Sequence, residues 1–309
     1  MPEQIFGNSG SLALGTAQLG LAYGVVNRLG QPDSLTADAI LDASAAAGIR
    51  VLDTARDYGD AEARIGAWLS RRGHPPGQRP LIVTKTGRFP AGETVEAWLR
   101  RCLARSLEAL GLQAVDALLL RSEDALQPGT GPALDRLKQE GLIRAAGLSV
   151  YEPAHLQAAL QAWRPDAVQL TMNVFDTRFR DAGLLEECRR QGIAVFARSV
   201  YLQGLLVSEP GGIPDRLAAA RPALAAFRAL TDSLGLPPAG LAQSFVRDTP
   251  GITSLVLGAE SVDQLKDTVR NAGWPPLTER AKEQLAEIVR LAPPWLADPR
   301  IWPQPAGGR

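Results

Sequence analysis

The chain has 309 residues, 45% of them hydrophobic, and its 33 Lys and Arg residues balance 33 Asp and Glu residues. Balanced charge excludes a global field that would attract nucleic acid or an anionic membrane, so any anion must be bound locally. The first ten residues lack a signal-peptide pattern, and no apolar run reaches the ~18 residues of a membrane span. We therefore expect a soluble, cytoplasmic protein that contacts neither membrane nor nucleic acid.

Apolar segments of strand length alternate with longer segments of helical period along the chain, which is the pattern of βα units around a parallel sheet. The eight strand candidates are residues 12–16, 49–53, 81–85, 115–120, 143–149, 167–169, 194–198 and 254–258. The helix candidates are residues 36–47, 61–71, 95–110, 131–140, 153–163, 181–191, 217–247 with a break at Pro237-Pro238, and 262–271.

This alternation predicts an α/β fold, a single-domain (β/α)8 TIM barrel. The barrel is expected over about residues 11–272, and a C-terminal helix and tail over about residues 277–309. A doubly wound open sheet is the competing architecture. It would normally carry a glycine-rich phosphate turn after its first strand, and Leu14-Gly15-Thr16-Ala17-Gln18 is not such a turn.

Residues suited to proton transfer follow two of the predicted strands. Asp53 ends the second strand with Tyr58 just beyond it, and Lys85 ends the third. The carboxyl ends of all strands of such a barrel open onto one face, so these three side chains should converge there. A phenol beside an ammonium group can give and take a proton, because a neighbouring cation favours the phenolate form. The trio therefore predicts an acid/base site.

The chain resembles the aldo-keto reductase family over nearly its full length. The resemblance rests on several segments in a characteristic order, and the family implies the same barrel fold. The segments are Leu14 to Gly20, Val51 to Ala55 with Tyr58-Gly59, Thr84-Lys85, Gly141 to Ser149, Val168-Gln169, Asn173 and Leu257-Gly258-Ala259. The residues from Arg198 to Leu206, with Gly147 to Tyr151, look closest to the branch associated with surface-polysaccharide and sugar biosynthesis.

The resemblance implies catalytic roles for four residues. Tyr58 would exchange a proton with the substrate carbonyl, and Lys85 and Asp53 would be its partners. The family places a histidine at the end of the fourth strand, where this chain has Arg121. The two histidines, His74 and His155, lie away from the strand ends and are expected at the surface.

Arg121 would change the chemistry, because arginine stays charged and only donates hydrogen bonds, whereas histidine can also accept them. A second cation near the Tyr58 oxygen would favour the phenolate and suit a base, and it could hold a carboxylate, a phosphate or a developing enolate. The alternative is that Arg121 turns outward and pairs with Glu123 or Asp124.

The resemblance also implies a nicotinamide cofactor, NADP or NAD. Ser149 and Gln169 match the family residues that hold the carboxamide, Val150 replaces the third of that set, and Arg198 replaces the aromatic residue that stacks on the nicotinamide. Glu260 stands where many relatives have a basic residue. The implied cofactor residues are Thr16, Ser149, Gln169, Arg198, Ser199, Leu202, Gly204, Gly258, Ser261 and Gln264. Alternatively, Ser149 and Gln169 only satisfy hydrogen bonds at the barrel end.

The leading hypothesis is an oxidoreductase that moves hydride between NAD(P) and a carbonyl or hydroxyl carbon of a sugar-like small molecule, which could be anionic. The alternative is a non-redox lyase, isomerase or cyclase that acts on a keto sugar and uses Tyr58, Lys85 and Arg121 for proton abstraction. No metal-ligand spacing accompanies the two cysteines, Cys102 and Cys188, so no metal site is expected. The sequence leaves the oligomeric state open.

Overall fold

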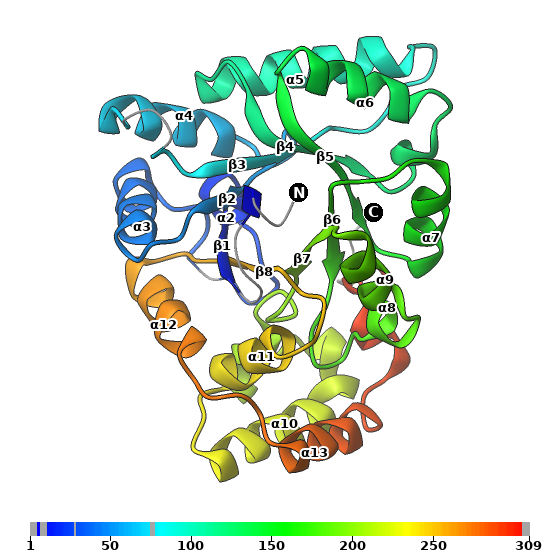
Figure 1. The fold of residues 1–309 in the computed structure, drawn as a ribbon. Helices are drawn as coiled ribbons and strands as arrows, with labels where there is room; N and C mark the ends of the chain where they lie inside the picture. Colours follow the sequence, from blue (N-terminus) through cyan, green and yellow to red (C-terminus); the bar gives the residue numbers. More distant parts are fainter. Residues whose placement is uncertain (1–4, 7–10, 28, 75–77, 305–309) are drawn as a thin grey trace.

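The computed structural model describes residues 5–6, 11–27, 29–74 and 78–304, and its centre is a closed barrel of eight parallel strands in sequential order. Figure 1 shows this barrel ringed by helices. The predicted (β/α)8 fold is thus confirmed. The strands are β1 (Ser11–Gly15), β2 (Val51–Asp53), β3 (Leu81–Lys85), β4 (Val115–Arg121), β5 (Ile143–Val150), β6 (Ala167–Thr171), β7 (Ala194–Arg198) and β8 (Ser254–Gly258).

A helix follows each strand on the outside of the barrel, and further helices are added to this repeat. The helices are α2 (Ala17–Gly20), α3 (Ser34–Ala46), α4 (Ala61–Arg72), α5 (Val95–Leu110), α6 (Thr130–Gln139), α7 (Pro153–Ala162), α8 (Arg178–Asp181), α9 (Leu184–Gln191), α10 (Arg221–Leu234), α11 (Pro238–Arg247), α12 (Val262–Ala272) and α13 (Glu279–Val289). Short 3-10 turns connect them at η1 (Asp124–Leu126), η2 (Leu205–Val207), η3 (Pro210–Gly212), η4 (Asp215–Ala220), η5 (Pro294–Ala297) and η6 (Pro299–Ile301).

Two helix predictions were wrong in their extent. The helix expected over residues 181–191 begins only at Leu184, because Gly183 adopts a left-handed conformation with φ 72° and interrupts it after α8. The helix expected over residues 217–247 is divided into η4, α10 and α11. Gly235, with φ 65°, ends α10, and Pro238 begins α11, so the break extends over several residues rather than two prolines.

The strand residues divide between two apolar layers in strict alternation. Residues such as Val51, Val83 and Phe196 form a cluster that takes members from the strands and Phe6 but none from the surrounding helices. Their neighbours, such as Leu52 and Ile82, belong to the larger cluster between the sheet and the helices. The first cluster is therefore the barrel interior, and every second strand residue faces it.

A separate apolar cluster lies outside the barrel, where α10 packs against α13. Figure 1 shows these two helices side by side beyond the ring of barrel helices. The cluster includes Trp302 of the C-terminal tail, whose indole donates a hydrogen bond to the carbonyl of Leu296. The last residues of the predicted tail, 305–309, lie outside the described residues. The described part of the tail is thus anchored by its own buried side chains.

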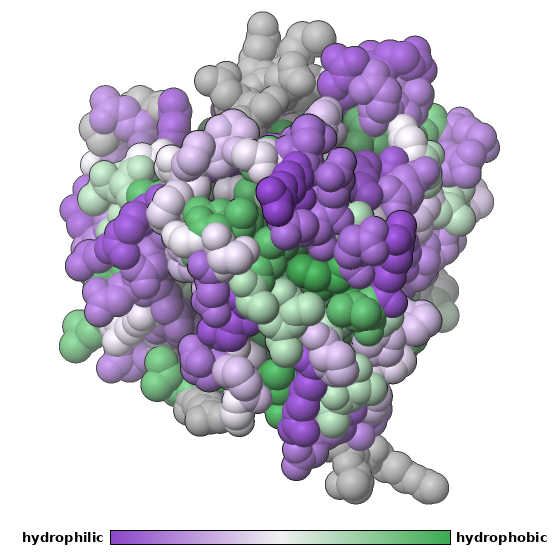
Figure 2. All heavy atoms as spheres, turned by 90° about the horizontal axis from the view of Figure 1, so that it is seen from below, coloured by the Kyte–Doolittle hydropathy of each residue, from purple (hydrophilic) through white to green (hydrophobic). Residues whose placement is uncertain are grey.

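The outer surface mixes charged and apolar side chains. Figure 2 shows one face, seen from below relative to Figure 1, on which hydrophilic side chains dominate and apolar ones gather near the middle. Within the described part of the chain, no helix combines the length and the hydropathy that crossing a bilayer requires.

Candidate active site

The carboxylate of Asp53 and the ammonium group of Lys85 form a buried ion pair at the carboxyl end of the barrel. The Nζ of Lys85 donates to Oδ1 and Oδ2 of Asp53 at 2.7 and 2.8 Å, and to the carbonyl of Thr54 at 2.9 Å. Asp53 and Lys85 are the last residues of β2 and β3, and each lies two positions after an interior valine, so both face inward. The strands alone therefore bring them together.

Tyr58 lies beside this pair. The Nζ of Lys85 is 4.9 Å from the centroid of the Tyr58 ring. Burial opposes the charge of Lys85, but the Asp53 carboxylate and the Tyr58 phenolic oxygen outweigh it and raise the pKa of Lys85 above its ordinary value. Lys85 is therefore a permanent cation near neutral pH. The structure thus places the predicted trio in contact, and the role of each residue in proton transfer remains a prediction.

The backbone of Tyr58 is held by two glycines. A Cβ on Gly20 would lie 1.8 Å from the carbonyl oxygen of Tyr58, and a Cβ on Gly59 would lie 2.2 Å from the carbonyl oxygen of Gly20. Gly59 also has φ 56°, which favours glycine. Only glycine allows α2 to approach the β2–α4 loop this closely, so these two positions fix where the Tyr58 side chain begins.

Ser149 and Gln169 continue the hydrogen-bond network from the opposite side of the barrel. The amide of Gln169 donates to Oδ1 of Asp53 at 2.7 Å, and its oxygen faces the Ser149 hydroxyl at 3.4 Å. Both residues therefore bond within the barrel, as one of the two sequence interpretations expects. Their contact with a cofactor remains a prediction.

Arg121 is the last residue of β4 and occupies one of the alternate positions whose side chains face the barrel interior. Ala117 and Leu119 belong to the interior cluster, so the next such position is Arg121, which lies in register with Ser149. Arg121 forms no hydrogen bond or ion pair with a described residue. Burial raises the pKa of the Asp124 carboxyl, and the charge of Arg121 counteracts that rise. Burial acts in the same direction on Glu123, but hydrogen bonds and the charge of Arg121 outweigh it and lower the pKa of that carboxyl. The guanidinium group thus lies near both acidic residues without pairing to either.

A cavity of about 500 Å³ opens next to Tyr58 and extends across the barrel end to α12. This volume is within the usual range for a small-molecule site. The predicted residues that line it are Asp53, Tyr58, Arg198, Ser199, Gly204, Gly258 and Gln264. The predicted residues outside its lining are Thr16, Lys85, Arg121, Ser149, Gln169, Leu202 and Ser261.

Three of the residues outside the lining support those within it. The buried Thr16 hydroxyl donates to the carbonyl of Asp53 at 2.9 Å. Leu202 is fully buried under the loop that follows β7. Ser261 is the N-cap of α12 and accepts from the backbone N–H of Gln264 at 3.2 Å, while the side chain of Gln264 accepts from the backbone N–H of Glu260 at 2.7 Å. The start of α12 is thus capped by its own side chains.

The loop after β7 carries backbone strain at the cavity. Ser199, Leu202 and Gln203 have φ values of 61°, 51° and 54°, and they are the non-glycine residues with positive φ among those described. Such conformations cost about 1–3 kcal/mol each and concentrate at functional sites. Their clustering beside Arg198 marks this loop as part of the site.

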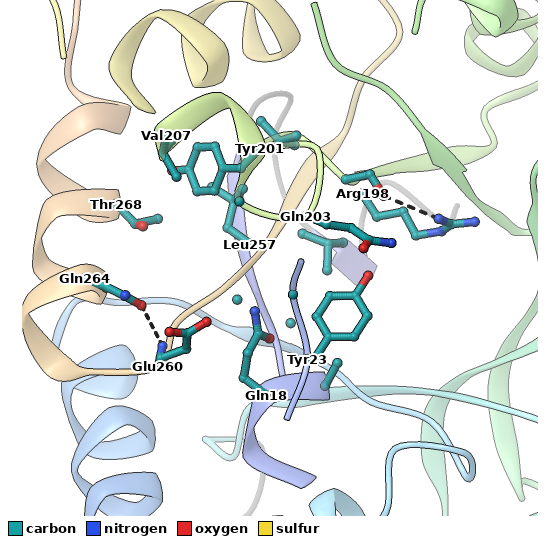
Figure 3. Close-up of a pocket in the computed structure, with 18 of the residues that line it drawn as sticks. Gln18, Tyr23, Arg198, Tyr201, Gln203, Val207, Leu257, Glu260, Gln264 and Thr268 are labelled. Atoms are coloured by element: carbon teal, nitrogen blue, oxygen red, sulfur yellow. Dashed lines mark hydrogen bonds between the residues drawn. The ribbon is translucent and has the colours of Figure 1, made fainter. Parts of the chain in front are cut away.

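Several residues that line the cavity were not among the predicted site residues. Tyr23 lies in the α2–α3 loop, and Asp267, Thr268 and Asn271 lie on α12. The α12 residues follow Gln264 at helical spacing, so the face of that helix was a usable signal. Figure 3 shows Tyr23 pointing toward Gln203 on one side of the cavity, and Glu260, Gln264 and Thr268 on the other. Burial, followed by the neighbouring Tyr58, raises the pKa of Tyr23 to about 12, so it stays neutral.

Neither histidine is near this cavity. His74 packs on Trp68 with the two ring centroids 5.1 Å apart, and His155 lies in the first turn of α7. Both are half-buried rather than fully exposed, so the expected surface position is only approximate.

Comparison with known proteins decides the family. The model of the aldo/keto reductase family matches residues 11–290. The chain belongs to the aldo/keto reductase family. This is a family of oxidoreductase enzymes.

Two relatives and one solved structure illustrate the match. The aldo-keto reductase str7 of Strobilurus tenacellus is 31% identical over 204 residues, which cover 64% of this chain and 59% of that protein. The D-threo-aldose 1-dehydrogenase of a Pseudomonas species is 27% identical, with 86% of this chain and 95% of that protein covered. An aldo-keto reductase of Bacillus halodurans, solved in its holo form, has a TM-score of 0.74 at 24% identity and covers 92% of each chain. This last likeness concerns the fold alone.

Proposed function

We propose that this aldo/keto reductase interconverts a carbonyl and a hydroxyl group on a sugar-like small molecule, with Tyr58 as the acid/base. The observation that carries the proposal is that Tyr58 and Asp53 line the same cavity that extends to α12. The proposed proton donor therefore lines the same cavity as Gly258 and Gln264, which the family resemblance assigns to the cofactor. The sugar-like substrate is supported by the D-threo-aldose 1-dehydrogenase relative.

In this proposal the buried charges at the base of the cavity orient the reaction. Lys85 keeps its proton and faces the Tyr58 ring, so it stabilises negative charge on the phenolic oxygen after Tyr58 has donated its proton. Asp53 holds Lys85 in place, and Gln169 and Thr16 hold Asp53 through its carboxylate and its carbonyl. A bound nicotinamide would supply or accept the hydride.

We propose NAD(H) rather than NADP(H) as the cofactor. The residues present fit a dinucleotide, because the cavity has the strained β7 loop on one wall and the start of α12 on the other. Among the described residues that line it, Arg198 alone carries a positive charge. The carboxylates that line it include Glu260, just before α12, and Asp267 on α12. A carboxylate can accept a hydrogen bond from a ribose hydroxyl and repels a 2′-phosphate. Arg270, on the exposed side of α12, already pairs with Asp267 at 2.7 Å.

Titration of the purified protein with NADH and NADPH, followed by nucleotide fluorescence, tests this proposal. NADH should bind in the micromolar range and at least about tenfold more tightly than NADPH, which corresponds to about 1.4 kcal/mol. Glu260→Lys should reverse or remove that preference. Glu283→Lys, an exposed charge reversal on α13, is the matched control and should leave it unchanged. If neither nucleotide binds at millimolar concentration, the oxidoreductase proposal fails.

Two observations favour the non-redox alternative. Gln169, which would hold the carboxamide, already donates to Asp53, and Arg198 brings charge to the expected nicotinamide position. An enzyme that only abstracts a proton would keep the trio and need no dinucleotide. The same titration separates the two proposals.

A further inference from the structure

The charges at the mouth of the barrel are unevenly compensated. Lys85 is neutralised by Asp53 within 2.8 Å. Arg198 forms no ion pair with a described residue, and its two hydrogen bonds are long, at 3.3 Å to the carbonyl of Val150 and 3.5 Å to the Ser199 hydroxyl. Arg198 also lines the cavity, so a cation without an ion-pair partner borders it.

Arg121 occupies the equivalent position on β4. Each arginine ends its strand, and each lies two residues after an interior side chain, which is Phe196 for Arg198 and Leu119 for Arg121. Both side chains therefore begin in the interior layer at the open end of the barrel. Arg198 lines the cavity, whereas Arg121 lies outside its lining and near Asp124. Neither arginine forms an ion pair with a described residue, and two such cations above a neutral ion pair can attract an anion.

The tail of the chain holds Arg198 in its position. The Cζ of Arg198 lies 4.0 Å from the centroid of the Tyr151 ring, and the Cζ of Arg300 lies 4.3 Å from the same centroid. Two guanidinium groups this close to one ring have room only on opposite faces, so Tyr151 is flanked by both. Arg300 comes from the C-terminal η6, about a hundred residues after Arg198 in the sequence.

Arg300 is itself fixed by two carboxylates. It pairs with Asp298 of the tail and with Glu152, the residue that follows Tyr151. Arg178 of α8 contacts the same two carboxylates, at 3.4 Å from Glu152 and 3.8 Å from Asp298. The charge of Arg300 is therefore compensated, whereas that of Arg198 is not. This difference indicates a positioning role for Arg300 and a binding role for Arg198.

We propose that the substrate carries a carboxylate or phosphate group, that Arg198 and Arg121 bind it, and that Tyr151 and Arg300 are positioning residues for Arg198. This inference rests on the proposed function, because it names the substrate class of the same site. It also gives the C-terminal tail a part in recognition, since the tail supplies Arg300.

Calorimetric binding of unreactive probes to the full-length protein saturated with NAD⁺ tests the inference. Succinate and glycerol 3-phosphate are the anionic probes, and succinamide and glycerol are their neutral counterparts. At least one anionic probe should bind about tenfold or more tightly than its neutral counterpart, and which of the two does so distinguishes a carboxylate from a phosphate. Equal binding within a pair for both pairs, or no binding of either anion at about 10 mM, overturns the inference.

Variants assign the residues. Arg198→Gln and Arg121→Gln should each weaken binding of the anion about tenfold and leave the neutral probe unchanged. Arg280→Gln, an exposed arginine on α13, is the matched control. Wild-type affinity for the anion in both Arg198→Gln and Arg121→Gln contradicts the inference.

The positioning role of Arg300 has its own readout. Arg300→Gln should weaken binding of the anion about threefold, and Arg300→Lys, which keeps a cation over Tyr151, should restore it. Equal loss in both variants would show that Arg300 only supports the fold. Failure of the proposed oxidoreductase function remains distinguishable, because it would appear as absent NADH and NADPH binding, and the anion titration can then be repeated without nucleotide.

Discussion

The two ends of the barrel interior are built from the same strands, yet they differ completely in chemistry. At the amino end, interior positions carry apolar side chains such as Val51, Val83 and Phe196. Two residues further along the same strands, the interior positions carry Asp53 and Lys85 on β2 and β3. We call the apolar layer at Val51, Val83 and Phe196 the floor, and the charged layer at Asp53 and Lys85 the mouth. The two layers are two residues apart along each strand.

This difference explains how buried charges are tolerated. The floor is closed by Phe6, which packs edge-on against Phe196 with the ring centroids 5.2 Å apart. The ion pair above it is shielded from water below and open to the cavity above. Substitutions at the floor should mainly lower the free energy of unfolding, whereas substitutions at the mouth should also lower turnover.

The largest effect is expected at the mouth, from Lys85→Met. This change leaves the Asp53 carboxylate buried without its cation, which should lower the free energy of unfolding by about 3–5 kcal/mol. It should also reduce turnover by about 10²–10⁴-fold, because Tyr58 loses its neighbouring charge. Urea denaturation and steady-state kinetics measure the two effects. Lys266→Met on α12, where the lysine is mostly exposed, is the matched control, and similar losses there would contradict the assignment.

The ion pair of Lys85 and Asp53 should make the stability of the fold fall at alkaline pH. In the folded protein, the Asp53 carboxylate outweighs the effect of burial and raises the pKa of Lys85 above its ordinary value. The pair should therefore stabilise the fold throughout neutral and mildly alkaline pH, and this contribution should be lost as the pH rises through the raised pKa. Urea denaturation from pH 7 to 11 should show an alkaline loss in the wild type that is absent from Lys85→Met. An equal loss in both proteins would contradict it.

At the floor, Phe196→Ala should cost about 3–5 kcal/mol of stability through a cavity among apolar side chains. NADH affinity and turnover at a temperature well below unfolding should stay within about threefold of wild type. A loss of turnover as large as that of Lys85→Met would show that the two ends are not separable.

Among substitutions at the mouth, the smallest expected effect on turnover comes from Gly20, whose contact with the Tyr58 backbone tests how far the mouth extends. A Cβ on Gly20 would meet the Tyr58 carbonyl at 1.8 Å, and a Cβ on Gly66 of α4 would meet the Ala109 carbonyl at 2.3 Å. Both Gly20→Ala and Gly66→Ala should destabilise the fold, because a backbone contact must yield in each. Only Gly20→Ala should also lower turnover, by about tenfold, since it displaces Tyr58. Equal turnover in the two variants would place Gly20 outside the site.

Much of this arrangement could be predicted from the sequence. The alternation of side chains along a strand is a local property, and the repeated order of strand and helix predicts a parallel sheet. The strand ends at Asp53, Lys85 and Arg198 were predicted at their observed residues, and the barrel fold and the family are confirmed. The branch of the family and the cofactor roles of Ser149 and Gln169 stay predictions.

The rest depends on contacts that sequence spacing does not encode. Arg300 reaches Tyr151 only because the tail packs against the residues that follow β5. The left-handed conformations of Leu202 and Gln203 are not those that leucine and glutamine prefer locally, so tertiary packing imposes them. The division of the helix expected over residues 217–247 is different, because the glycine that ends α10 is a local signal that the sequence does contain.

The most direct test of the central claim, that Tyr58 moves the proton at the mouth of this barrel, is turnover by Tyr58→Phe. The tyrosine hydroxyl accepts and donates the transferred proton in this account, so carbonyl reduction should fall by about 10²–10⁴-fold while NADH affinity and stability stay near wild type. Turnover within tenfold of wild type, with NADH still bound, would contradict the account and place the proton donor elsewhere.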